Sequence, residues 1–259
     1  MDELILDILK QLRDSSQGAL DTHQLEMLIN SHNSGIDSSA HSTEREKLIP
    51  KRAILPYFLQ VKQNNDELWQ SWNVTPELEE RFIRSVRMKP RRTASGVATI
   101  TVITRPHTCS SNCIYCPCDL RMPKSYLANE PACQRAELTF FDPYVQVAAR
   151  LQALHQMGHS TDKVELIVLG GTWSDYPESY QYWFIKELFR ALNEWPNSPS
   201  HIQERLNWYT SFGLQNSEEA LSSFVAEQQA AVFDDTATYN QAFHKLYDTS
   251  QPHQSAWSQ

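Results

Sequence analysis

Hydrophobic residues in the first part of the chain, residues 1–88, recur at helical spacing. Apolar residues every three to four positions line one face of an α-helix. One such stripe comprises Leu4, Ile5, Ile8, Leu9 and Leu12, and a second comprises Leu25, Leu28 and Ile29. The pattern predicts a helical N-terminal region.

Breaks in this pattern predict where its helices begin and end. Residues 32–43 are polar and rich in turn-forming residues, which indicates a loop, and Pro50 and Pro56 are expected to interrupt the next segment. Thr75 and Pro76 predict a helix start, because a capping residue precedes a proline at the first helical position. The predicted core face of that helix comprises Leu78, Phe82, Ile83 and Val86, with Arg81, Arg84 and Arg87 on its other sides.

Strands and helices alternate in the second part, residues 89–196. The stretch VATITVIT, residues 97–104, is short and β-branched, and VELIVLGGT, residues 164–172, is similar and ends in paired glycines. Both compositions are typical of buried strands. Asp142 and Pro143 predict a helix between them, and residues 180–194 predict another helix afterwards. Strand, loop and helix in this order indicate βα units on a parallel sheet or barrel, so the predicted fold class is α/β.

The third part, residues 197–259, is acidic and carries helical stripes but no further buried strand. The stripes comprise Leu221, Phe224 and Val225, then Tyr239, Phe243 and Leu246. The last residues, TSQPHQSAWSQ, carry no folding signal and are expected to be irregular. The sequence thus predicts three segments with boundaries at 88 and 196.

Composition limits the location and the partners of the chain. No run of about 18 apolar residues occurs, so no membrane span or membrane partner is expected. The acidic, amphipathic N-terminus lacks the features of a signal peptide, and the predicted location is cytoplasmic. The formal net charge is −8, yet residues 81–92 hold six basic residues and no acid. This segment is either a nucleic-acid contact or a solvated helix face followed by a linker.

Four of the five cysteines lie in one stretch, TCSSNCIYCPC, residues 108–118, hereafter the cysteine loop. Cys109, Cys113 and Cys116 follow the spacing C-x3-C-x2-C, and thiolates are the ligands that iron and zinc prefer. A [4Fe–4S] cluster held by three cysteines keeps one iron free for a ligand. Cys118 could instead complete an all-cysteine zinc site, although the usual pair of C-x2-C knuckles is missing. The loop directly follows the first predicted strand, where βα barrels build their sites.

Two resemblances follow from these residues. The cysteine spacing, with Tyr115 before the last cysteine, resembles the signature of radical S-adenosylmethionine enzymes. More closely, several blocks in order resemble the catalytic subunit of Elongator and its bacterial and archaeal relatives, which are acetyltransferases acting on the wobble uridine of tRNA. These blocks are KPRRTASGVATITVITRPHTC (89–109), NCIYCPC (112–118), SYLANEP (125–131), DPYVQ (142–146) and MGHSTDKVELIVLGGTW (157–173).

The resemblance implies a partial (βα) radical S-adenosylmethionine barrel after the helical N-terminal region. It implies that Cys109, Cys113 and Cys116 hold a [4Fe–4S] cluster and that S-adenosylmethionine lies against the strand end formed by Gly170, Gly171 and Thr172. It implies that Lys163 contacts acetyl-CoA, the co-substrate, and that the N-terminal region binds tRNA. The RNA-binding residues are then Arg81, Arg84, Arg87, Lys89, Arg91 and Arg92. No catalytic side chain is assigned.

The chain also departs from this family. Cys118 and Asp119 stand where relatives have two glycines, and no role is assigned to Cys118 or Cys133. A complete barrel takes roughly 200–250 residues, whereas about 170 follow residue 89, and no glycine-rich coenzyme A loop is present. The expectation is the N-terminal half of a longer or split enzyme, with a second chain supplying the rest and no tRNA modification by this chain alone. The alternatives are a radical S-adenosylmethionine enzyme with a small-molecule substrate and a non-catalytic RNA-binding or zinc module.

Overall fold

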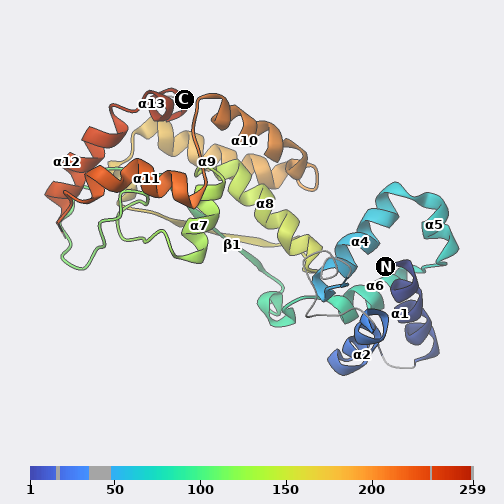
Figure 1. Ribbon diagram of the computed structural model, residues 1–259. Helices are drawn as coiled ribbons and strands as arrows, with labels where there is room; N and C mark the ends of the chain where they lie inside the picture. The colour runs from blue at the N-terminus through green and yellow to red at the C-terminus, as the bar shows by residue number, and fades with distance from the viewer. Residues whose placement is uncertain (16–17, 35–47, 234, 258–259) are drawn as a thin grey trace. The chain divides into compact units, whose positions relative to one another are not determined.

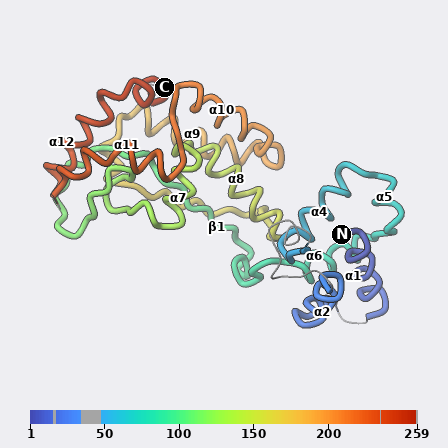
Figure 2. The backbone as a smooth tube through the Cα atoms, in the orientation of Figure 1, coloured from blue at the N-terminus to red at the C-terminus, as the bar shows by residue number. Residues whose placement is uncertain are grey.

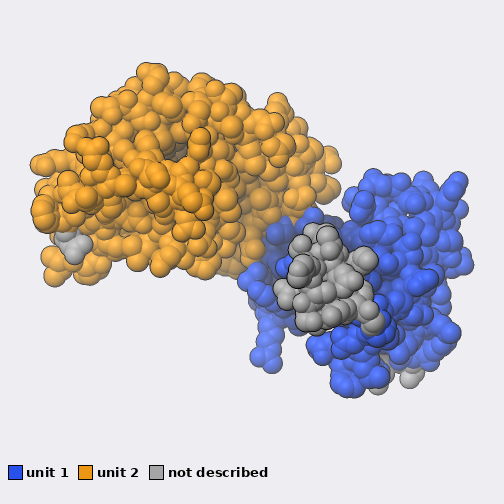
Figure 3. Space-filling view, viewed as in Figure 1, with its two compact units in different colours: residues 1–98, 153–163 blue, residues 99–152, 164–259 orange. Residues whose placement is uncertain are grey.

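The computed structural model describes residues 1–15, 18–34, 48–233 and 235–257. The chain divides into two compact units (Figure 3). The first unit comprises Met1–Ala98 and Ala153–Lys163, and the second comprises Thr99–Gln152 and Val164–Gln259. The three segments predicted from the sequence have different boundaries from these units. The division at residues 88 and 196 therefore stays a prediction.

The first unit is helical, as the hydrophobic stripes predict (Figure 1). Its helices are α1 (Asp2–Asp14), α2 (Thr22–Asn33), α4 (Lys51–Asn64), α5 (Asp66–Ser71) and α6 (Pro76–Val86). The predicted start of α6 is confirmed, because the Thr75 side chain accepts a hydrogen bond from the backbone N–H of Leu78 at 3.2 Å. This cap satisfies one of the N–H groups that the first helical turn leaves without a partner.

The core of the first unit is built from the predicted stripes and a stack of aromatic rings. All five members of the α1 stripe are fully buried. The ring of Phe58 stacks on that of Phe82, with centroids 4.1 Å apart, and also on that of Trp72. Burial of large aromatic side chains is a major source of core stability, so this stack joins α4 to α6.

The breaks predicted at Pro56 and at residues 32–43 differ from the observed helices. Pro56 lies inside α4 and does not interrupt it, so that prediction was wrong. The helix buries Ile54, Leu55 and Phe58 on one face, and this packing outweighs the backbone hydrogen bond that a proline removes. The predicted loop at 32–43 begins within α2, and its residues 35–43 lie outside the described residues.

The second unit contains β2, all but the first residue of β1, all but the last turn of α8 and the helices after it. Figure 2 shows the backbone from β1 through a long irregular connection to α7. The strands are β1 (Ala98–Ile103) and β2 (Val164–Leu169). The helices are α7 (Pro131–Leu138), α8 (Pro143–Gln156), α9 (Glu178–Asn193), α10 (Ile202–Ser211), α11 (Glu218–Gln229), α12 (Thr236–Tyr247) and α13 (Gln251–Trp257). The predicted helix starts at 143 and near 180 are confirmed. Helix α10 was not predicted, and α13 occupies residues that were expected to be irregular.

The two strands pair in parallel. Ala98 N donates to Lys163 O at 2.8 Å and Thr104 N donates to Leu169 O at 2.9 Å, and the constant offset between partners requires strands that run in the same direction. The described residues form a mostly helical α/β fold with this one two-stranded sheet. The predicted α/β class is confirmed, whereas a barrel is not.

The two strands differ in burial. Four of the six residues of β1 are buried, but none of those of β2 is, and Ile167 and Val168 are each 37% exposed. The prediction of a second buried strand was therefore right about the strand and wrong about its burial. Within the described residues β2 has a neighbour on one edge only. A parallel strand of this apolar composition is normally covered on both faces, so β2 offers an open edge and an open face.

No helix among the described residues is both long and apolar enough to cross a membrane.

A buried glutamine on α8 completes the hydrogen bonding of β1. The Gln146 side-chain amide donates to Ile103 O at 2.9 Å, and its carbonyl accepts from Ile103 N at 2.8 Å. One side chain thus satisfies a donor and an acceptor that are both buried. A buried backbone group without a partner costs about 1–3 kcal/mol.

Replacing Gln146 with leucine is expected to lower the free energy of unfolding by about 2 kcal/mol or more, because both backbone groups of Ile103 lose their partner. Urea denaturation measures the change. Gln152 is exposed on the same helix, and Gln152→Leu should change the stability by less than about 0.5 kcal/mol. Equal effects of the two substitutions would contradict this role for Gln146.

Candidate functional site

The cysteine loop lies in the irregular connection between β1 and α7, in the second unit. Its cysteines differ in exposure: Cys109 is buried, Cys116 is half-buried and Cys113 is exposed. Tyr115, between the last two, is 85% exposed. The loop thus leaves β1 in the core and carries its later thiols toward the surface.

Polar side chains from distant parts of the second unit hold this loop. Asn240 on α12 pairs with the backbone of Cys109, accepting from its N–H at 3.1 Å and donating to its carbonyl at 2.8 Å. The Asp175 carboxylate accepts hydrogen bonds from the N–H and the hydroxyl of Ser110, at 2.7 and 2.9 Å. Thr236 donates its hydroxyl to the carbonyl of Ser111 at 2.8 Å. The loop backbone is therefore held by side chains from several elements of the second unit.

The cysteine loop meets the glycine-rich end of β2. The Cys109 sulfur lies 3.3 Å from the hydroxyl oxygen of Thr172. Two motifs that the sequence places far apart are thus in contact at the carboxyl ends of two parallel strands. Crevices at these ends are where α/β sheets bind their ligands.

The two glycines before Thr172 have different surroundings. A Cβ atom on Gly170 would lie 1.9 Å from the Thr104 hydroxyl oxygen, so only glycine fits there. On Gly171 it would lie no closer than 3.7 Å to any atom, the nearest being the backbone nitrogen of Lys124. Gly170 is therefore explained by strand packing, whereas the neighbouring chain does not require a glycine at 171.

The three thiols of the C-x3-C-x2-C motif influence one another. The charge of Cys116 is the largest cause of a raised pKa at Cys113, to which burial and the charge of Cys109 also contribute, while Lys124 opposes it. Repulsion between neighbouring thiolates is relieved by a bound metal cation, which also holds its ligands deprotonated. The chemistry of this donor set therefore fits a thiolate-bound metal centre.

Within the described part of the chain, no three His, Cys, Asp or Glu side chains lie close enough to surround one metal ion. The thiols interact electrostatically, yet they do not form a single-ion site.

The other two cysteines have partners of their own. The ammonium of Lys124, itself buried, donates to the Cys118 sulfur at 2.8 Å and lies over the ring of Tyr239. Cys133 is fully buried in an apolar cluster, and burial raises the pKa of its thiol to about 12, so it stays protonated. Cys118 is thus engaged elsewhere than in a fourth ligand position, which argues against the all-cysteine zinc site.

The predicted RNA-binding residues, all in the first unit, fall into two groups. Arg81 donates to the carbonyls of Leu12 and Ser15, at 2.6 and 2.9 Å, and so holds the end of α1. Arg84 forms an ion pair with Glu80 one helical turn away. Arg87 is half-buried, and its Nε is buried. The exposed cations of this set that form no ion pair within the described residues are Lys89, Arg91 and Arg92.

Lys163 lies apart from the motifs at the strand ends. It is exposed and directly precedes β2, and its carbonyl accepts the hydrogen bond from Ala98. Gly170 follows the other end of the same strand, and the six residues between them span about 20 Å at roughly 3.3 Å per residue. The structure therefore brings together the cysteines, Gly170, Gly171 and Thr172, but not Lys163.

Sequence reasoning missed the residues that support the loop. Asp175, Thr236 and Asn240 are polar residues that belong to no recognised motif. Lys124 is of a residue type that ordinarily lies on the surface. Only the position of Asp175, just after the glycine-rich strand end, was a usable signal. The contacts of the others depend on tertiary structure.

Comparison with known proteins supports the predicted resemblance. The chain is 41% identical over 139 residues to a tRNA uridine(34) acetyltransferase of Methanocaldococcus infernus, covering 51% of this chain and 26% of that protein. It is 48% identical over 105 residues to the tRNA uridine(34) acetyltransferase of Dehalococcoides mccartyi, covering 40% and 23%. It is 41% identical over 127 residues to Elongator complex protein 3 of Schizosaccharomyces pombe, covering 45% and 23%.

These matches confirm the resemblance over about half of this chain. The chain spans about a quarter of the length of the curated relatives that it matches. No protein-family profile matches it.

The two glycines provide a matched pair of substitutions. Gly170→Ala is expected to lower the free energy of unfolding by about 1–3 kcal/mol, because the new methyl group overlaps Thr104. Gly171→Ala should change it by less than about 0.5 kcal/mol. Denaturant titration of both variants measures the difference, and a Gly170→Ala protein as stable as the parent would refute the close approach of the two strand ends.

Proposed function

We propose that this chain takes part in modifying the wobble uridine of tRNA and that it does so as a radical S-adenosylmethionine enzyme with acetyl-CoA as co-substrate. The contact between Cys109 and Thr172 carries the proposal, because it joins the three-cysteine motif to the glycine-rich strand end. The names of the relatives favour a tRNA uridine over a small-molecule substrate.

The proposed roles follow from the surroundings of each residue. Cys109, Cys113 and Cys116 hold the [4Fe–4S] cluster, which with S-adenosylmethionine supplies the chemistry of a 5′-deoxyadenosyl radical. Asn240 and Asp175 fix the loop backbone, so the first thiol is oriented before the cluster binds. Gly171 and Thr172 would line the strand end that holds S-adenosylmethionine, and the absence of a side chain at 171 would let this ligand approach the backbone closely. Gly170 keeps the two strand ends together.

The open edge of β2 supports the proposal of a (βα) barrel. A strand with unpaired N–H and C=O groups and exposed apolar residues is suited to pair with a further parallel strand. A barrel closed in this way would also keep water from the radical. We propose that the partner strands come from further polypeptide, in the same chain or in a second one, and that the enzyme acts in the cytoplasm.

The proposed contacts to the substrates lie in different parts of the chain. Lys89, Arg91 and Arg92 are exposed on one short segment of the first unit, and exposed cations without acidic partners suit phosphate contacts. Arg81, Arg84 and Arg87 lie on α6 or directly after it, just before this exposed segment. Arg81 and Arg84 already form contacts within the first unit. Lys163 is the proposed contact to acetyl-CoA, on the resemblance alone.

Iron incorporation tests the proposed cluster. Anaerobic reconstitution is expected to yield about four irons per chain, with matching sulfide. Alanine at Cys109, Cys113 or Cys116 should abolish this, because each supplies one of only three thiolates. Alanine at Cys118 or Cys133 is the matched control and should leave the iron content unchanged. Loss of iron from the Cys118 variant equal to that from Cys113→Ala, or zinc in place of iron, would overturn the assignment.

Salt dependence of tRNA binding tests the basic segment. In a double variant with Arg91→Glu and Arg92→Glu, tRNA should bind more weakly. The slope of log K against log salt concentration should become shallower by about 2, since about 0.9 counterions are released per phosphate contact.

The control for this experiment is a double variant of the same unit with Lys10→Glu and Arg52→Glu, which changes two other exposed cations and the net charge equally. If both double variants make the salt dependence equally shallow, the change in net charge explains the result. Arg91 and Arg92 would then have no specific role in binding tRNA.

A further inference from the structure

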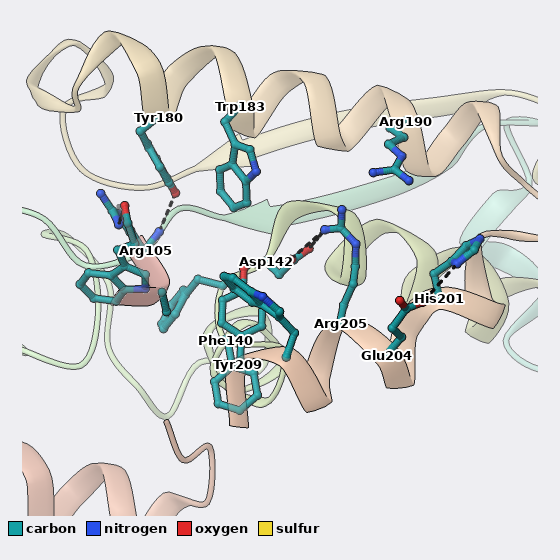
Figure 4. Close-up of a pocket in the computed structure, with 14 residues that line it drawn as sticks. Arg105, Phe140, Asp142, Tyr180, Trp183, Arg190, His201, Glu204, Arg205 and Tyr209 are labelled. Atoms are coloured by element: carbon teal, nitrogen blue, oxygen red, sulfur yellow. Dashed lines mark hydrogen bonds and ion pairs between the residues drawn. The ribbon is translucent and has the colours of Figure 1, made fainter. Parts of the chain in front are cut away.

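A cavity of about 330 Å³ lies in the second unit (Figure 4). Its walls come from α9, α10, the residues before α8 and the end of α13, and no residue of the cysteine loop lines it. Small-molecule sites in proteins occupy roughly 300–1,000 Å³, so this volume suffices for a small ligand.

Aromatic rings form much of the wall. Phe140 stacks on Tyr209, with centroids 5.1 Å apart and planes 22° apart, and Trp208 packs edge-on against Tyr209 at 4.8 Å. Tyr180 and Trp183 face the cavity from α9 (Figure 4). Rings of this kind offer faces on which a flat ligand can stack.

Two of the three arginines that line the cavity are neutralised by carboxylates. Arg205 donates to both oxygens of Asp142, at 2.9 and 3.1 Å, and also to Glu187. Arg190 donates to Glu194 at 2.8 Å. Their charges are thus already compensated within the protein.

Arg105, the third arginine, has no acidic partner within the described residues. Its guanidinium lies between the rings of Tyr180 and Trp257, at 4.6 and 4.7 Å from their centroids, and donates to the carbonyl of Trp257 at 3.1 Å. Its Nε is buried and forms no hydrogen bond with the described residues. Burial lowers the pKa of Arg105, yet a guanidinium stays charged in proteins. Arg105 is half-buried, and a cation partly removed from water without a counter-ion favours the binding of an anion beside it.

We propose that this cavity binds a small ligand made of a flat aromatic ring and one anionic group, with the ring stacked on the aromatic wall and the anion at Arg105. Figure 4 shows Arg105 at one end of the lining residues and His201 with Glu204 toward the other end. Arg190 and Arg205 are already paired with carboxylates, so within the described residues Arg105 is the lining arginine available to the anionic group of the ligand. A nucleoside monophosphate and an aryl carboxylate both have this chemistry. The inference rests on neither the cluster nor tRNA modification.

Calorimetry and quenching of tryptophan fluorescence test the proposal with adenosine monophosphate and indole-3-carboxylate as probes. Binding of either supports the site, and the preferred one identifies the anion as phosphate or carboxylate. Adenosine and inorganic phosphate, each with half of the chemistry, should bind at least tenfold more weakly than adenosine monophosphate. Binding of neither probe, or of adenosine as tightly as its monophosphate, overturns the proposal.

Variants locate the binding. Arg105→Gln should weaken binding of the probe at least tenfold, because it removes the contact to the anion. Trp208→Ala should weaken binding at least fivefold, because it removes a stacking surface. Lys186→Gln, on the exposed side of α9, is the control and should have no effect. Circular dichroism checks folding, and Trp208→Ala carries the test if Arg105→Gln does not fold. Unchanged affinity in a folded Arg105→Gln protein, or in Trp208→Ala, would show that the probe binds elsewhere.

Discussion

The parallel pairing of β1 with β2 is the constraint on which the candidate site depends. It places Thr104 against Gly170 so closely that no side chain fits between them, and beyond this point Cys109 meets Thr172. If the register slipped by one residue, the side chains of β2 would exchange faces, and this contact would be lost. The site is therefore a property of the sheet as much as of the cysteine loop. Asp175 and Asn240 then fix the loop that the sheet has positioned.

Local signals were sufficient for the elements that position the site. The Asp142–Pro143 start and the β-branched run before the cysteines predicted what the structure shows, because proline and strand composition act over a few residues. The cap at Thr75, in the first unit, was predicted for the same reason. The predicted break at Pro56 was wrong, since packing of α4 outweighs the backbone hydrogen bond that the proline removes. The formation of α13 and the exposure of β2 depend on contacts with segments that are distant in the sequence. No local pattern of residues predicts such contacts.

The candidate site was predictable in part for the same reason. Spacing and resemblance identified the three cysteines and the glycine-rich strand end, and the structure brings these together. It does not bring Lys163 to them. The predicted RNA-binding arginines also differ in role, because Arg81 holds the end of α1 whereas Arg91 and Arg92 are exposed. The partners of Cys118 and of Arg105 lie on elements that meet only in the folded chain. A charged residue with a structural partner and one free for a ligand look alike in the sequence.

We propose that the cysteine loop holds a [4Fe–4S] cluster with one iron open to S-adenosylmethionine. Electron paramagnetic resonance of the anaerobically reconstituted and reduced chain tests this most directly, with spectra recorded before and after S-adenosylmethionine is added. We expect the signal of a reduced [4Fe–4S] cluster that changes when S-adenosylmethionine is added and that is absent from the Cys113→Ala variant. A cluster signal that S-adenosylmethionine leaves unchanged, or a colourless protein that binds zinc, would contradict it.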